Sequence, residues 1–480
     1  MSIVHCLSEG WLLDHLFFVN KSGYQLCHSH ERSARDFLGV SSAAASSDKY
    51  PVVDASPATS NGCRKKSVSE LGTAGKKSDA MLNKTYMFRE EFFNVFKPHI
   101  AVDFQKEPQQ QSFEVGLEDG KERQEGAKSD VSHSVAPRKK RKRSREFNRG
   151  EHDALEYHLK ISKVIAEGTR SLVQEGLKSG FLQPSSMKPV CSKTHDMRPS
   201  DCGLAELCEM AKQYSSVNET EQTTVSKIDE EAFLPEQVQL SCVTQNIMNY
   251  TKLITLMGHK YLFPPKSCFL LSDISCMQPL LNYNKKFDVI VIDPPWENKS
   301  LKRSNRYSHL PPWQIKQIPV PALAAPECLV ITWVTNRQKH LRFVKDELYP
   351  HWAVHGVVEW YWVKITRSGE FVFPLDSPHK KPYEVLVLGR IQGSRDLPLR
   401  NKISGDEALP IPGHKLIVSV PSTLHSHKPP LTEILKEYTR PDVECLELFA
   451  RNLQPGWTSW GNEVLKFQHM DYFTEVQNKK

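Results

Sequence analysis

The chain has 480 residues, of which 39% are hydrophobic, and is long enough for two or three domains. Its formal net charge of +7 suits a polyanionic partner but does not establish one. No apolar run approaches the roughly 20 residues of a membrane-spanning helix, and residues 1–20 hold Glu9 and Asp14 but no Arg or Lys, so neither a membrane nor a secreted protein is expected. Eleven cysteines without a C-x-x-C pair indicate reduced thiols and no metal site.

The first hundred residues alternate short apolar runs with polar, serine-rich stretches. The run 11–19, followed by a polar segment with Gly23, predicts a strand and a turn. Residues 86–96 hold five aromatic side chains, which are core-forming. We therefore predict a small N-terminal module over 1–100, interrupted by a disordered insert at about 41–80.

Residues 101–150 are polar and charged and predict a disordered linker. Within it, seven of the nine residues from Pro137 to Arg145 are basic. Such a run is typical of a nuclear import signal or of a phosphate-binding arm, and a solvated charge block is the plain alternative. We take the import signal as the first choice, which makes the import machinery a partner and the nucleus the expected location. A cytoplasmic or mitochondrial pool stays open.

Apolar residues at helical spacings run from Leu155 to Leu177, and Gly180 is placed to end the pattern. This periodicity predicts a mainly helical module over 151–235. The catalytic domain is expected over 236–470, with a tail at 471–480.

A short apolar run, residues 289–292, reads as a buried strand and leads directly into Asp293, Pro294, Pro295 and Trp296. In open α/β sheets, ligands bind beyond the carboxyl ends of the strands. The carboxylate and the proline carbonyls accept hydrogen bonds, and the indole offers a surface for base stacking, worth about 1–3 kcal/mol. This combination suits the exocyclic amine of a nucleobase. The plain alternative is a proline turn with an exposed tryptophan.

Basic residues and one aromatic follow the motif within a few positions. They are Lys299, Lys302, Arg303, Arg306 and Tyr307. Binding a single nucleic-acid strand requires such a combination of charge and stacking surface. An ordinary solvated loop is the alternative.

The motif resembles the DPPW motif of the eukaryotic adenine N6-methyltransferases, the family of the messenger-RNA adenosine methyltransferase, and the chain is similar to its methyltransferase-like four branch. Further matches follow in the family's order: residues 272–274, 331–335, 362–364, 379–384, 425–429, 447–452 and 461–462. Two departures stand out. Ala450 replaces the family's usual glycine, and two residues, including a histidine, are missing between Arg451 and Asn452.

The resemblance implies transfer of a methyl group from S-adenosyl-L-methionine to the N6 amine of adenosine in RNA. The branch suggests 2′-O-methyladenosine of a small nuclear RNA. A DNA adenine N6-methyltransferase and a catalytically silent RNA-binding scaffold are the alternatives. Because the catalytic strand precedes the cofactor strand, the implied fold is a doubly wound, seven-stranded Rossmann-like α/β fold with permuted motif order, plus smaller N-terminal modules.

The resemblance and the residue chemistry above together assign roles to residues. The catalytic residues would be Asp293, Pro294, Pro295 and Trp296, with the Asp293 carboxylate and the Pro294 carbonyl accepting the amine hydrogens. The cofactor would be held by Asp273, Ile274, Asp293, Lys428, Arg451, Asn452 and Asn462. The substrate would be held by Trp296, Lys299, Lys302, Arg303, Arg306, Tyr307, Lys364 and Glu384. The expected partner is RNA, with DNA left open. No membrane is expected, and we expect the chain to act as a monomer.

Overall fold

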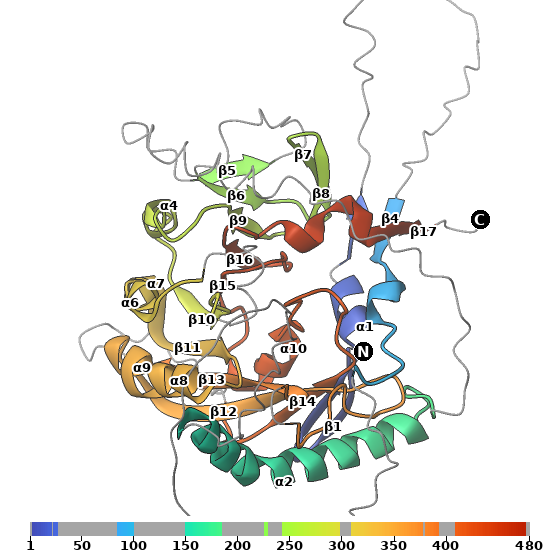
Figure 1. Cartoon of the computed structure of the whole chain (residues 1–480). Helices are drawn as coiled ribbons and strands as arrows, with labels where there is room; N and C mark the ends of the chain where they lie inside the picture. The colour runs from blue at the N-terminus through green and yellow to red at the C-terminus, as the bar shows by residue number, and fades with distance from the viewer. Residues whose placement is uncertain are drawn as a thin grey trace, which may run out of the picture.

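The computed structural model describes residues 2–21, 23–26, 84–99, 149–184, 225–228, 242–297, 309–377, 380–392 and 409–476 (Figure 1). Its strands are β1 (Ile3–Leu7), β2 (Gly10–Leu13), β3 (Gln25–Leu26), β4 (Lys84–Phe88), β5 (Val225–Ile228), β6 (Val243–Asn246), β7 (Lys252–Leu256), β8 (His259–Phe263), β9 (Cys268–Leu270), β10 (Phe287–Ile292), β11 (Ala324–Val334), β12 (Val354–Lys364), β13 (Tyr383–Ile391), β14 (Leu416–Ser419), β15 (Cys445–Leu448), β16 (Trp457–Trp460) and β17 (Phe473–Val476).

The α-helices are α1 (His15–Asn20), α2 (Arg149–Lys178), α4 (Gln278–Asn282), α6 (Pro312–Lys316), α7 (Val320–Leu323), α8 (Gln338–Arg342), α9 (Tyr349–His351) and α10 (Thr432–Leu435). Short 3-10 turns are η1 (Glu90–Phe93), η3 (Lys436–Tyr438), η4 (Lys466–Gln468) and η5 (Met470–Tyr472), and η2 (Phe343–Leu348) is a π-helical turn. Within the described ranges, none of these helices is long and apolar enough to cross a bilayer.

One mixed sheet of 12 strands organises the structure, in the order β1-β2-β14-β12-β13-β11-β10-β15-β16-β9-β6-β5. Its centre, from β12 to β9, is parallel except for β13, which runs antiparallel to both of its neighbours. The strand β10 precedes β15 in the chain yet lies beside it in the sheet. The predicted α/β fold with permuted motif order is therefore confirmed, and the seven-stranded centre is extended at both edges.

The central strand β10 is buried on both faces of the sheet. Ile290 and Ile292 pack into the hydrophobic core on one face, and Val289 and Val291 pack into the core on the other. Successive side chains of a strand point to opposite faces, so a central parallel strand needs an apolar residue at every position. This requirement explains the continuous apolar run ahead of Asp293.

The predicted N-terminal module is not a separate body. The hairpin β1-β2 joins the central sheet through β14, with Gly10 paired to Leu416 and Leu13 to Ser419. The strand β4 pairs with β3 and with β17, so part of the predicted C-terminal tail is also structured. The hairpin β1-β2 joins the central sheet because β14 would otherwise be an edge strand with unpaired N–H and C=O groups.

The predicted strand over 11–19 is also wrong at its end. The strand β2 stops at Leu13 and α1 begins at His15, because Asp14 caps the helix. Its Oδ1 accepts a hydrogen bond from the Phe17 N–H at 2.9 Å, which satisfies one of the free donors of the first turn.

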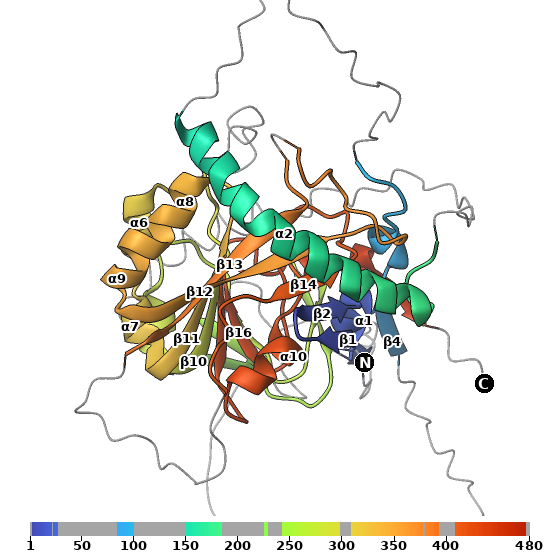
Figure 2. The same ribbon diagram turned by 90° about the horizontal axis from the view of Figure 1, so that it is seen from below.

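The predicted helical module is, in the described residues, the single helix α2. It crosses one face of the sheet and contacts β1, β2, β14, β12 and α8 (Figure 2). The expected apolar stripe is buried at His158, Ile161, Ile165 and Leu172, whereas Leu155 is exposed. The helix ends as predicted, with Gly180 at φ +75° just beyond it. Residues 225–228 form β5 of the sheet rather than part of that module, and the predicted insert at 41–80 and linker up to 148 lie outside the described residues.

We predict that Gly10→Ala separates β2 from β14. Gly10 has φ +152°, and a Cβ there would lie 1.9 Å from the Leu416 carbonyl oxygen. The unfolding free energy should fall by about 2–4 kcal/mol in a denaturant titration. Gly413→Ala is the matched control, because its Cβ would meet nothing within 4 Å. Equal stabilities for the two variants would contradict the pairing.

Candidate active site

The carboxyl ends of four neighbouring strands form one row. The strand register pairs Ile292 of β10 with Leu448 of β15, Leu448 with Trp460 of β16, and Trp460 with Leu270 of β9. The segments that follow these residues therefore meet at one edge of the sheet. They are Asp293–Trp296, 449–452, Gly461-Asn462 and 271–274. These are the segments in which the sequence predicted the catalytic and cofactor residues.

Asp293 is buried, with 7% of its surface exposed, and faces two cations. Arg451 Nη1 donates to its Oδ2 at 2.7 Å, and Lys428 Nζ lies 3.7 Å from its Oδ1. Ser426 Oγ donates to Oδ2 at 3.4 Å. A carboxylate has about four lone-pair positions, so these partners leave room for a further donor such as an amine N–H.

Glu384 lies between two lysines at the same edge. Lys364 Nζ lies 2.5 Å from its Oε1, and Lys428 Nζ contacts its Oε2. Burial acts to raise the pKa of Glu384, but the two ammonium groups outweigh it and hold the pKa well below its usual range. Lys428 also lies 5.2 Å from the centre of the Trp333 ring, a cation–π contact.

The charges continue past Asp293. Arg451 Nε donates to Glu463 Oε2 at 3.0 Å, and Lys466 Nζ lies 2.8 Å from Glu463 Oε1. Burial acts to lower the pKa of Arg451, but Asp293 and Glu463 outweigh it and the pKa is raised. We call the resulting series of alternating charges the charge chain. It consists of Lys364, Glu384, Lys428, Asp293, Arg451, Glu463 and Lys466.

Both proline carbonyls of the motif already accept one hydrogen bond. The Pro294 carbonyl accepts from the Trp296 N–H at 2.8 Å, and the Pro295 carbonyl accepts from the Leu310 N–H at 3.1 Å. A carbonyl oxygen has two lone pairs. Each therefore keeps capacity for one more donor, and the Pro294 carbonyl follows Asp293 directly.

Trp296 does not offer a stacking surface, contrary to the expectation. Only 5% of it is exposed, its Nε1 donates to the Trp333 carbonyl at 2.8 Å, and its ring lies 4.9 Å from that of His340. Burial of a large indole with its N–H satisfied stabilises this arrangement. Trp296 thus belongs to the core under the motif.

The remaining predicted cofactor residues lie at the ends of the neighbouring strands. Asp273 Oδ1 accepts from the Ser275 N–H at 2.9 Å, which holds the turn after β9. Ile274 packs against the core, Asn452 is half-buried and Asn462 is exposed. The structure brings all four to the Asp293 edge.

Ala450, the departure from the family pattern, fits without strain because the left-handed backbone falls on Phe449, with φ +60°. The loops after β15 and β16 touch closely here. A Cβ on Gly461 would lie 3.1 Å from the Ala450 carbonyl oxygen. A small residue at each position lets the two loops meet.

The predicted nucleic-acid loop, with Lys299, Lys302, Arg303, Arg306 and Tyr307, lies outside the described residues. Its role stays a prediction. The other predicted substrate residues, Lys364 and Glu384, are in the charge chain.

Sequence reasoning missed Ser426, Glu463 and Glu447. Glu463 directly follows the predicted Asn462, and Ser426 lies two positions before the predicted Lys428, so proximity in the chain was an available signal. Glu447 lies inside the E-L-F-A-R segment and is buried. Burial raises its pKa to about 7, while Gln454 Nε2, at 3.1 Å from Oε2, acts in the opposite direction.

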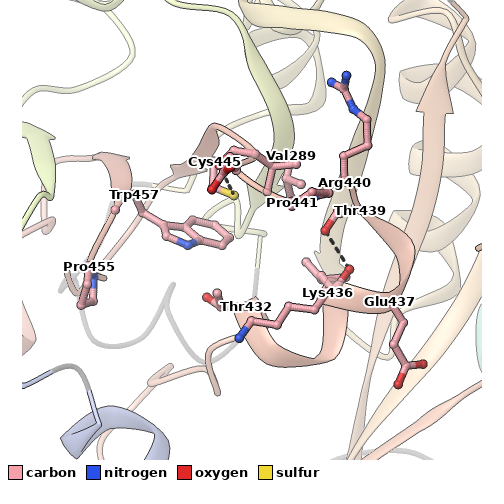
Figure 3. Close-up of a pocket in the computed structure, with 14 residues that line it drawn as sticks. Val289, Thr432, Lys436, Glu437, Thr439, Arg440, Pro441, Cys445, Pro455 and Trp457 are labelled. Carbon is pink, nitrogen blue, oxygen red and sulfur yellow. Dashed lines mark hydrogen bonds between the residues drawn. The ribbon is translucent and has the colours of Figure 1, made fainter. Parts of the chain in front are cut away.

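A hollow of about 650 Å³, whose lining residues Figure 3 shows, lies at the amino ends of β15 and β16. Cys445 and Trp457, the first residues of β15 and β16, line it together with Thr432, Lys436 and Arg440. It is therefore separate from Asp293, which follows the last residue of β10.

Comparison with known proteins agrees with this geometry. Residues 287–463 match the MT-A70 family. Over 483 aligned residues the chain is 56% identical to the N(6)-adenine-specific methyltransferase METTL4 of Homo sapiens, with 100% of both chains covered. The chain belongs to the MT-A70 family.

Two more distant relatives align with about half of the chain. The N6-methyladenosine RNA methyltransferase MTA1 of Pyricularia oryzae is 36% identical over 230 residues, which are 46% of this chain and 58% of the relative. A DNA N6-methyl methyltransferase of Caenorhabditis elegans is 32% identical over 222 residues, 45% of this chain and 56% of the relative.

The MT-A70 match begins at Phe287 and ends at Glu463. It contains every member of the charge chain except Lys466. The helices α1 and α2 and the strands β1 to β9 precede it. Of these elements, β1, β2, β5, β6 and β9 share the 12-stranded sheet with the matched strands, and α2 contacts β12 and β14.

Two buried histidines lie behind the Lys428 side of the site. His15 and His427 are 2% and 3% exposed, and their ring centres are 5.1 Å apart. Burial lowers the pKa of His427 to about 3. Burial, and then the facing His427, lower the pKa of His15 well below its usual range.

We predict that acid destabilises the protein partly through these histidines. A histidine in the unfolded chain has a pKa near 6.5. Below that pH the unfolded chain binds protons at these two histidines, whereas the folded protein does not, because their pKa values are lowered. The contribution of the two histidines to the unfolding free energy is therefore fully present above pH 6.5. It is lost as the pH falls toward 3, by up to about 1.4 kcal/mol per pH unit for each histidine.

The measurement compares the unfolding free energy of wild type and His427→Phe between pH 8 and pH 5. The variant should lose less stability over this range, and the two slopes should agree near pH 8. Comparing the two proteins removes the effect of Glu447, whose raised pKa gives the opposite slope. Parallel curves throughout would contradict the burial of a neutral His427.

Proposed function

We propose that this chain transfers a methyl group from S-adenosyl-L-methionine to the exocyclic N6 amine of adenosine in RNA. The chain is an adenine N6-methyltransferase, as its family and its full-length likeness to the human and mouse METTL4 proteins indicate. The observation that carries the proposal is the buried Asp293 carboxylate at the end of β10, with acceptor capacity left and the Pro294 carbonyl next to it.

The main task of the protein in this reaction is to position the adenine amine against the methyl group. The lone pair of an aryl amine is delocalised into the ring, so the amine must be held with that lone pair aimed at the incoming methyl group. Two acceptors on its two hydrogens, Asp293 and the Pro294 carbonyl, favour a pyramidal nitrogen. No strong base is needed, because the methylated ammonium is acidic enough to lose its proton afterwards.

The charge chain fits the proposed cofactor. S-adenosylmethionine supplies, when bound, an electrophilic methyl group on a sulfonium, and its amino-acid end carries an ammonium and a carboxylate. Both signs of charge lie together at this edge, with the half-buried Lys428 and Arg451 beside Asp293 and Glu463. The residues that would hold the cofactor are Asp273, Ile274, Asp293, Lys428, Arg451, Asn452 and Asn462.

A base paired inside a duplex cannot reach a buried carboxylate, so we propose a single-stranded or flipped adenine. Lys364 and Glu384 would contact the edge of the base. Because Trp296 is buried, we assign stacking to Tyr307, and the phosphates to the basic residues that precede it. Those residues lie outside the described ranges.

RNA is the favoured substrate class, and 2′-O-methyladenosine of a small nuclear RNA is the proposed target. The name of the Pyricularia oryzae relative supports RNA. DNA is the second candidate, because the Caenorhabditis elegans relative is named for DNA. A silent scaffold has no need of a buried Asp293 held by two cations, which speaks against that alternative.

We predict that Asp293→Asn lowers methyl transfer at least about 100-fold, because one carboxylate oxygen becomes a donor and repels the amine. The assay is mass spectrometry of nucleosides from matched RNA and DNA oligonucleotides, incubated with S-adenosylmethionine and the purified chain alone, since we propose that it acts as a monomer. Asp288→Asn, at the other end of β10, is the control and should keep its activity.

N6-methylated nucleoside should form in the RNA, and most readily at a 2′-O-methyladenosine. Product in DNA alone would overturn the RNA proposal and leave the chemistry standing. Near-normal turnover by Asp293→Asn would overturn the assigned mechanism.

We also propose that the chain is nuclear and that residues 137–145, which lie outside the described ranges, carry the import signal. Replacing Lys139 to Arg143 by alanine should move a tagged protein into the cytoplasm, because import receptors recognise clustered basic charge. Fluorescence imaging measures the distribution. Activity of the purified variant should be unchanged, and unaltered nuclear accumulation would favour the phosphate-binding arm instead.

A further inference from the structure

The turn from Ser426 to Lys428 faces the active site on one side and the N-terminal part of the chain on the other. Ser426 Oγ bonds Asp293 at 3.4 Å, and Lys428 contacts Glu384 and lies 3.7 Å from Asp293. His427 stands between them in the sequence. Its ring packs instead into a separate cluster of aromatic side chains.

Four rings surround His427, and we call them the aromatic box: Phe467, His15, Phe88 and Phe93, at centre-to-centre distances of 4.4, 5.1, 5.3 and 6.0 Å. His15 comes from α1, Phe88 from β4, Phe93 from η1 and Phe467 from η4. None of the four lies within residues 287–463, the MT-A70 match. The chain therefore surrounds one residue of the family domain with rings from outside that domain.

Shape rather than hydrogen bonding holds the His427 ring. Its Nδ1 is buried and has no hydrogen-bond partner among the described residues. The preceding residue, Ser426, has φ +61°, in the left-handed region that residues other than glycine rarely adopt. A strained turn of this kind persists only where its surroundings impose it, and the packed His427 ring provides that constraint.

We propose that His427, held by the aromatic box, is a positioning residue that fixes Lys428 between Glu384 and Asp293, and that His15 of α1 acts with it. The proposal rests on the proposed function, in which Lys428 holds a charged end of S-adenosylmethionine. Lys428 has a flexible four-carbon stem, so an anchored neighbouring residue reduces the conformations open to its ammonium group.

The test measures binding of S-adenosylmethionine by calorimetry, which requires no nucleic-acid substrate. His427→Ala should weaken binding roughly tenfold, because the turn loses its anchor, and Lys428→Ala should weaken it at least as much. His427→Phe keeps a flat ring in the box and should bind within about twofold of wild type. His15→Ala removes one wall of the box and should weaken binding a few-fold.

A double-mutant cycle separates positioning from general damage to the core. If His427 acts through Lys428, adding His427→Ala to Lys428→Ala should cost nothing further, whereas independent effects multiply. His469→Ala is the matched control: it is also buried, and it packs on Tyr261 outside the box. It should leave the affinity unchanged.

Melting temperatures of all variants are recorded so that each assay is run on folded protein. If His427→Ala does not fold, His15→Ala in the Lys428→Ala background performs the same cycle. Multiplying effects, or normal affinity in His427→Ala, would overturn the positioning role while leaving the proposed function intact. Absence of binding by wild type would instead overturn the proposed function.

Discussion

The alternation of charges from Lys364 to Lys466, half-buried around the buried Asp293, is the constraint on which the candidate site depends. Each carboxylate in this series has cations on both sides, so removal of a carboxylate leaves two cations facing each other with no anion between them. Such a series is stable only if its backbone supports are rigid. The strand register, the tight contact of Gly461 with Ala450 and the Ser426 turn supply that rigidity.

Two glutamates show how neighbouring groups decide the pKa of a carboxyl. Glu447 is buried and Glu384 is half-buried in the same sheet, and desolvation acts to raise the pKa of both. Lys364 and Lys428 reverse the effect at Glu384, which stays ionised. Glu447 has an amide partner, Gln454, and its pKa remains raised at about 7. The two acids thus differ in pKa because ammonium groups face one and an amide faces the other.

The extended sheet makes the family domain and the N-terminal elements one packed unit. The hairpin β1-β2 covers the edge at β14, and α2 lies across one face. His158 of α2 lies 3.1 Å from the hydroxyl of Tyr383, the neighbour of Glu384. His15 and Phe88 of the aromatic box pack on His427, which is the residue before Lys428. The chain neighbours of Glu384 and Lys428 thus both contact residues that precede the MT-A70 match.

Local patterns in the sequence were sufficient to predict the elements that carry the chemistry. A strand buried on both faces needs a continuous apolar run, so β10 and the place of Asp293 at its end followed from residues 289–293 alone. The stripe of α2 and the stop at Gly180 followed from helical periodicity in the same way. Resemblance to a family then assigned Lys428 and Arg451 to the cofactor and Glu384 to the substrate.

Contacts between residues far apart in the chain were decided only by the tertiary structure. Arg451 bonds Asp293 across 158 positions, and no local pattern encodes which cation meets which acid. Trp296 is buried because α8 and β11 enclose it, and the N-terminal strands join the sheet because β14 offers an open edge. Propensity and periodicity describe one segment at a time, whereas burial and ion pairing depend on which segments meet.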